Sequence, residues 1–291
     1  MTPAAGAAHR LCTEAGGAAD VDFRIGLSPI ALEDWFEGGE AEPATRKDAI
    51  FAEHPGLSWG ETDGSRPAQA EVAALVQAWA EASGRASVLD AELPPLRAAA
   101  RLVSDDLCLM ERRPGPTGDA AWTLTAVSLC APSFFSAEDV LGRSLDAIHD
   151  PVPTFNDRFL PRVARMFDHL APDMVLTRRN WSLVPTDVLF IPSADGLRAE
   201  LPLMAAEDIA ARLQVRRERQ TIRKLPQTGA VIFTIRIWLE PVVELLADPP
   251  RRAAFARAWE RLDTAEGEVM RGYKHLGLFD GAVRLLLAEG R

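Results

Sequence analysis

The residues best suited to chemistry lie in the segment LGRSLDAIHDPVP, residues 141–153, with His149 near its end. Pro151 and Pro153 fix their own φ and push the residue before each away from helical conformations, so an extended, stiff backbone is expected after the histidine. A histidine held this way among apolar neighbours can ligate a metal, because an imidazole ligand needs a fixed ring plane and few competing waters. The residues alone equally allow a histidine that caps a turn and hydrogen-bonds its own backbone.

Arginines gather in three places in this otherwise acidic chain. They stand in RRNW (178–181), in RRERQTIRKLP (216–226) and at Arg236 within an apolar run. Local positive charge of this kind suits an anionic ligand, since the guanidinium fork matches carboxylates and phosphates. The other interpretation is that alternate arginines at a helix end pair with nearby glutamates and the helix dipole. Both interpretations stay open on the residues alone.

Composition excludes several classes of function. The chain has 291 residues and a formal net charge of −10, which argues against general nucleic-acid binding because that depends on clustered cations. No apolar run approaches the ~18 residues of a membrane span. The chain has three cysteines and no CxxC spacing. Three are too few for a cluster held by four thiolates, and they give no sign of a disulfide framework. The first 20 residues resemble a mobile small-residue tail rather than a signal peptide, and the cytoplasm is the expected compartment.

Common catalytic motifs are not found. The sequence contains no GxGxxG, GxxxxGK[ST], HExxH or GxSxG pattern. Of the other histidines, His9 lies in the tail, His54 stands beside a proline in a polar loop, and His169 is expected to be a partly exposed residue near a helix end. No spacing of histidines and carboxylates indicates a mononuclear non-haem iron site.

The elements that must position these residues indicate an α+β fold with an antiparallel sheet and surrounding helices. Ser136, with Asp139 three residues on, is expected to cap a short helix before His149. Apolar periodicity and turn residues predict helices at 44–53, 68–82, 94–102, 155–170, 205–218 and 250–270. Strands are predicted at 106–112 and 122–130, joined as a hairpin, at 180–191 with an interruption at Pro185, and at 229–239.

Four motifs occur in order: IHDPVP (148–153), RRNW (178–181), RERQTIRKLPQTGAVIFTIRIWLEP (217–241) and RGYKHL (271–276). Together they resemble the haem-dependent oxidative N-demethylase family, over a stretch from Phe23 to the C-terminus. The resemblance implies one domain over residues 21–291, with a PAS-like core that binds haem b. It also implies oxidation of a small secondary amine such as dimethylamine by O2, with release of formaldehyde. It further implies that electrons come from NADPH through separate FMN and iron–sulfur subunits.

The resemblance also implies residue roles. His149 becomes the expected axial ligand of the haem iron, which leaves the opposite face for oxygen. Arg219, Arg223 and Arg179 would pair with the haem propionates. Gln220 and Asn180 would hydrogen-bond ligands or fix an arginine. Further expectations are an apolar wall or core role for Phe233 and Ile235, packing or function for Tyr273 and Lys274, and a carboxylate for the amine among Asp195, Glu200 and Glu218. A non-catalytic haem or gas sensor, and a haem-free protein that binds an anionic metabolite, are the alternatives.

Overall fold

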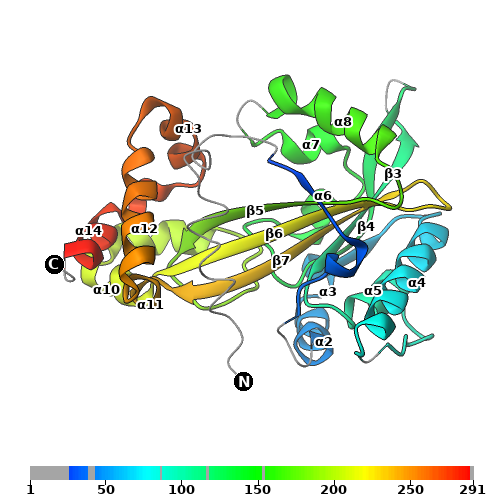
Figure 1. Ribbon diagram of the computed structural model, residues 1–291, viewed down its shortest axis with the longest axis horizontal. Helices are drawn as coiled ribbons and strands as arrows, with labels where there is room; N and C mark the ends of the chain where they lie inside the picture. The colour runs from blue at the N-terminus through cyan, green and yellow to red at the C-terminus, as the bar shows by residue number, and fades with distance from the viewer. Residues whose placement is uncertain (1–25, 39–42, 86, 116–117, 153–154, 289–291) are drawn as a thin grey trace.

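A seven-stranded antiparallel sheet forms the centre of the molecule (Figure 1). The computed structural model describes residues 26–38, 43–85, 87–115, 118–152 and 155–288, so the predicted tail and His9 lie outside the described residues. The strands follow the order β1-β5-β6-β7-β3-β4-β2 across the sheet. Their bounds are β1 Ser28–Ile30, β2 Trp59–Glu61, β3 Asp106–Pro114, β4 Ala120–Ser128, β5 Val175–Val184, β6 Gln214–Lys224 and β7 Val231–Pro241.

Helices surround this sheet, which confirms the α+β prediction. Within the described residues, no helix is long and apolar enough to cross a membrane. The α-helices are α2 Pro43–Glu53, α3 Pro55–Ser58, α4 Arg66–Ala82, α5 Pro95–Ala100, α6 Ala137–Val140, α7 Leu145–His149, α8 Leu160–His169, α9 Asp195–Glu200, α10 Ala206–Arg212, α11 Val242–Leu246, α12 Pro249–Arg261, α13 Ala265–Tyr273 and α14 Asp280–Ala288. The short helices are η1 Leu32–Asp34, the π-helical η2 Phe155–Phe159, η3 Leu201–Leu203 and η4 Leu276–Phe279.

The predicted hairpin is confirmed, because β3 pairs with β4 in antiparallel register. A second hairpin joins β6 to β7, where the Leu225 N–H donates to the Ala230 carbonyl at 2.7 Å and Gly229 adopts a φ of 71°. Glycine reaches this left-handed conformation without the strain that a Cβ brings. The carboxylate of Glu71 on α4 accepts hydrogen bonds from the turn, so the helix holds the hairpin in place.

The arginine-rich segment is a strand, and the prediction of a helix over 205–218 is wrong beyond Arg212. Helix α10 ends at Arg212 and β6 begins two residues later at Gln214. The strand was not predicted because buried arginines, rather than apolar residues, occupy its inward positions, so period-two hydrophobicity is absent. Its neighbour β5 begins at Val175 rather than 180 and ends at Val184, directly before Pro185, which has no N–H for the ladder.

The C-terminal region also differs from the prediction. The single helix expected over 250–270 is two helices, α12 and α13. Thr264 separates them, and its hydroxyl accepts a hydrogen bond from the Gly267 N–H as the N-cap of α13. The chain turns at this N-cap and a new helix begins. Apolar periodicity continues across the turn, so it predicted one helix where there are two.

Side chains alternate between the two faces of the sheet and build separate cores. At one end, α4 and α5 cover one face and α7 and α8 cover the other (Figure 1). At the opposite end, helices α10 to α14 enclose a third core. We call the side under α7 and α8 the α7 face and the side under α4 and α5 the α4 face. Each residue of β5, β6 and β7 belongs to one of these faces.

Candidate functional site

His149 is the last residue of α7, and its ring is fixed in one orientation. Its Nδ1 lies 2.8 Å from the carbonyl oxygen of Leu145. Because a carbonyl only accepts, Nδ1 carries the proton and Nε2 carries the free lone pair. The ring also stacks on Phe155, with centroids 4.0 Å apart and planes 13° apart. The imidazole therefore has a fixed orientation, in which Nε2 is the nitrogen that could bind a metal.

The surroundings of His149 favour the neutral form of the ring. Burial lowers the pKa of His149, and the nearby positive charge of Arg178 lowers it further, against the hydrogen bond to Leu145. A neutral imidazole is the form that ligates a metal. The contact with the Leu145 carbonyl is the backbone hydrogen bond that the plainer interpretation predicts, and it is also the contact that orients metal-ligating histidines.

The backbone around His149 agrees in part with prediction. Ser136 caps α6 in a complete capping box with Asp139, as expected. Asp150 has φ −52° and ψ −38°, so the expected extended conformation is wrong at this position. The turn closes instead, because the Val152 N–H donates to the His149 carbonyl at 2.8 Å. Pro153 lies outside the described residues.

The α7 face of the sheet carries polar and apolar residues below His149. Strand register pairs Arg178 with Gln220 and Asn180 with Glu218. Gln220 in turn pairs with Ile235. The apolar members of this face pack in the same cluster as Ile148 and Phe155 of the histidine segment; they are Leu176, Ile222, Phe233 and Ile235. Two of the predicted site residues, Asn180 and Gln220, therefore share a face with His149.

Exposure differs between the two faces of β7. Phe233 and Ile235 on the α7 face are half-buried, whereas Thr234 and Arg236 on the α4 face are 0% and 7% exposed. Fully packed strands bury both sets, so partly exposed apolar side chains mark a face with room for a ligand. The α7 face is thus the side of the sheet where an apolar ligand can add contact.

The three predicted propionate partners lie on the opposite, α4 face. Arg219 is 3% exposed, donates to the Trp35 carbonyl at 3.0 Å and to the Asp34 carbonyl, and lies 3.2 Å from Glu37. Arg179 also pairs with Glu37. These contacts tie the N-terminal segment to the sheet. The structure does not bring Arg179 and Arg219 together with His149.

Other arginines also have partners within the protein. The guanidinium of Arg223 lies 4.4 Å from the centre of the Trp35 ring, and Arg217 lies 3.7 Å from Glu240. Arg216 is fully buried and donates to Ser133 and to three backbone carbonyls, those of Ala131, Pro132 and Leu189. Pairing within the protein accounts for these three arginines, although in a strand rather than at a helix end.

A polar network on the α7 face centres on Glu218. One carboxylate oxygen accepts from Ser133 at 3.2 Å, and the other accepts from the amides of Asn180 at 3.3 Å and Gln220 at 3.0 Å. Lys274 donates to the Asn180 Oδ1 at 2.7 Å, which fixes the direction of that amide. Burial, and then the charge of Glu218, raise the pKa of Tyr273. These six residues gather from β5, β6, the C-terminal end of α13 and the segment before α6.

The sequence indicated Glu218 only by its position near the motifs. The two-residue alternation of side chains along a strand is the pattern that would have grouped Glu218 with Gln220. In a strand, residues 218 and 220 share a face, as do 178 and 180. The other two acidic candidates, Asp195 and Glu200, are exposed on α9. His169 is exposed at the end of α8, as predicted. His54 stacks on Phe190 with ring centroids 4.8 Å apart.

The chemistry open to the site follows from its ligand set. Among the described residues, no three His, Cys, Asp or Glu side chains gather where they could hold a metal ion. His149 alone can supply one bond to a metal whose other ligands come from a cofactor, and a haem iron meets this condition because its macrocycle supplies four nitrogens.

A comparison with protein families gives one match over most of the chain. Residues 70–284 match the family model described as haem-dependent oxidative N-demethylase, alpha subunit-like. The matched stretch includes α7 with His149 and the whole of β5, β6 and β7. No curated protein matches the chain. The chain belongs to the haem-dependent oxidative N-demethylase alpha subunit-like family.

Proposed function

We propose that the chain binds haem b through Nε2 of His149 and oxidatively N-demethylates a small secondary amine. The observation that carries this proposal is the imidazole itself, neutral, fixed by Leu145 and Phe155, and set over a half-buried apolar face. An axial haem ligand needs these properties. Family membership supports the same function.

The residues present fit a haem on the α7 face. Leu176, Phe233 and Ile235 offer an apolar wall to the macrocycle. Arg178 replaces the three arginines expected from sequence as the proposed propionate partner, because it lies on the α7 face of the sheet. Gln220, its partner in the strand register, is proposed as a hydrogen-bonding neighbour.

A PAS-like core is proposed for residues 21–291 as one haem domain. Its support is the strand order: the five long strands, taken in chain order from β3 to β7, lie as second, first, fifth, fourth and third across the sheet. Helices α6 to α8 fall between the second and third of these strands. This is the arrangement expected of a PAS-like core with its ligand between sheet and helices.

When bound, the haem would supply reductive activation of O2, which the side chains cannot perform. The chain's own part is to hold the substrate. Glu218 would accept the ammonium of a protonated secondary amine, and its three donors hold the carboxylate in one orientation. Oxidation of an N-methyl C–H bond gives a carbinolamine, which collapses to the primary amine and formaldehyde.

The electrons are proposed to come from partner subunits. The family description names an alpha subunit, which supports an assembly with other chains. NADPH, FMN and an iron–sulfur cluster are proposed to belong to those partners rather than to this chain, and a cytoplasmic location is proposed with them.

Formaldehyde release tests the proposed function. Haem-loaded protein, supplied with NADPH and a flavin reductase in air, is expected to release formaldehyde from dimethylamine. Glu218→Gln should raise KM for the amine at least about tenfold, since it removes the anionic partner of the ammonium. The control, Glu200→Gln on exposed α9, should behave as wild type. If the protein binds haem but releases no formaldehyde when the amine is added, the demethylase proposal is refuted and a non-catalytic haem sensor is favoured.

A further inference from the structure

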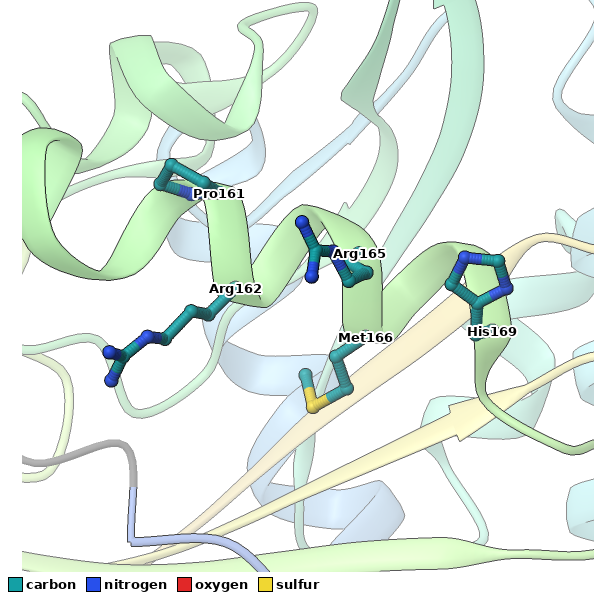
Figure 2. Close-up of a pocket in the computed structure, with 5 residues that line it drawn as sticks. All are labelled: Pro161, Arg162, Arg165, Met166 and His169. Atoms are coloured by element: carbon teal, nitrogen blue, oxygen red, sulfur yellow. The ribbon is translucent and has the colours of Figure 1, made fainter.

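The outer surface of α8 carries a basic groove that the proposed reaction does not use. A cleft of about 500 Å³ runs along the helix and is lined by Pro161, Arg162, Arg165, Met166 and His169. Figure 2 shows Arg162, Met166 and His169 following one another along α8. Positions 162 to 169 span two helical turns, about 10 Å. We call these five residues the α8 groove.

The cations of the α8 groove have no partner within the described chain. Neither Arg162 nor Arg165 makes an ion pair or hydrogen bond in the part of the molecule that the structure describes, and both are exposed. The acidic residue of the same helix is engaged elsewhere. Asp168 accepts from the Trp122 indole at 3.0 Å and lies 3.7 Å from Arg112. The groove is therefore locally positive on a chain whose net charge is −10.

The shape of the α8 groove favours a protein segment over a small molecule. Its lining comes from one helix, so the cleft is open to solvent, whereas small-molecule sites enclose and bury most of their ligand. Its half-buried methionine offers an adaptable apolar contact, and arginines are frequent anchors of protein interfaces. An acidic segment complements this combination.

Two aromatic contacts link the helix that carries the groove to the proposed haem ligand. Phe155 of η2 stacks on His149, and Phe159 ends the same π-helix one residue before α8 begins. The rings of Phe155 and Phe159 lie 6.2 Å apart. A partner bound in the groove would thus sit on the helix that continues from the ring contact of His149.

We propose that the α8 groove docks an acidic segment of a partner subunit. The docking stands on the charge and shape of the groove alone. Its use by the electron donor rests on the proposed function. Arg162 and Arg165 supply the charge that attracts the partner, and Met166 supplies the apolar contact.

Fluorescence anisotropy with a fluorescein-labelled oligoglutamate peptide tests the docking. The full chain is expected to bind the peptide saturably at low salt and to lose affinity as salt is added. Arg162→Glu with Arg165→Glu should weaken binding at least about tenfold. The matched control, Arg257→Glu with Arg284→Glu, makes the same charge change on the exposed surfaces of α12 and α14 and should bind as wild type.

Three results would overturn the proposal: no saturable binding, equal loss in both double variants, or equal competition by inorganic phosphate, which would make the groove a small-anion site. Thermal melts of both variants check that they fold. The absorption spectrum with haem separates this proposal from the proposed function. Both variants are expected to keep the spectrum of the wild type. A wild type that binds no haem would refute the proposed enzyme activity and would leave the proposed docking in the α8 groove unaffected.

Discussion

Arg219→Gln tests whether the arginines on the two faces of the sheet have different roles. The resemblance expected Arg219 to pair with a haem propionate, whereas the structure places it on the α4 face with Glu37 and two backbone carbonyls. We expect the variant to lose stability and to keep its haem. Arg178→Gln, on the α7 face, should instead weaken haem binding.

The magnitude follows from the contacts of Arg219. The substitution removes two charged hydrogen bonds to the Trp35 and Asp34 carbonyls and one ion pair with the half-buried Glu37, which keeps Arg179 as its partner. Charged hydrogen bonds contribute about 1.5–3 kcal/mol each, so the loss of two lowers the free energy of unfolding by about 3–6 kcal/mol. For a large domain, this lowers Tm by about 6–24 °C.

Denaturant unfolding and haem titration together make the assay. Arg219→Gln should shift the unfolding midpoint without a change in the haem spectrum or in haem affinity at a temperature where both proteins are folded. Arg178→Gln should weaken haem binding. An Arg219→Gln variant of wild-type stability that no longer binds haem would refute the assignment of faces.

Three further predictions follow from single contacts. Glu71→Gln should cost about 1–3 kcal/mol in unfolding free energy, because Glu71 accepts from the Gln227 N–H at 2.6 Å and from the Thr228 N–H at 2.8 Å; Glu81→Gln, exposed on the same helix, should cost nothing measurable in the same denaturant titration. Burial raises the pKa of Asp105 from 3.8 to about 6, against the charges of Arg236 and Lys47. A raised folded-state pKa gives stability that is complete below the unfolded value and is lost as pH rises through about 6. Between pH 4 and 7 the wild type should therefore lose up to about 3 kcal/mol of unfolding free energy relative to Asp105→Asn, which has no carboxyl to ionise. Parallel pH profiles of the two proteins would contradict this. Phe155→Ala should weaken haem affinity by about 10-fold or more, since it frees the ring of His149, while Phe134→Ala, 41% exposed, should leave haem titrations unchanged.

Local patterns were sufficient for several elements. Helix α4 follows from its apolar spacing, the β3–β4 hairpin from its turn residues, and the cap at Ser136 from its neighbour three residues on. His149 was also singled out locally as a candidate ligand, since adjacent prolines and apolar residues set it apart. Each of these signals is complete within about twenty residues of sequence.

The pairing of strands was not accessible in the same way. Arg219 and Gln220 are neighbours in sequence and lie on opposite faces of β6, so the motif that carries both cannot say which one meets a ligand. That β6 is a strand was hidden because Arg216 and Arg219 fill buried positions that a pattern reserves for apolar residues. Glu37 pairs with Arg179 but lies 142 residues away from it in the sequence, a separation that no local pattern spans.

Haem titration of three proteins tests the central claim most directly. Absorption spectra are recorded as haem is added to the wild type, to His149→Ala and to the control His169→Ala, whose ring is exposed on α8. We predict a Soret band of ligated haem in the wild type and the control, its loss or shift in His149→Ala, and its restoration by added imidazole. A His149→Ala spectrum identical to that of the wild type, or a wild type with no Soret band at any haem concentration, would contradict haem ligation by His149.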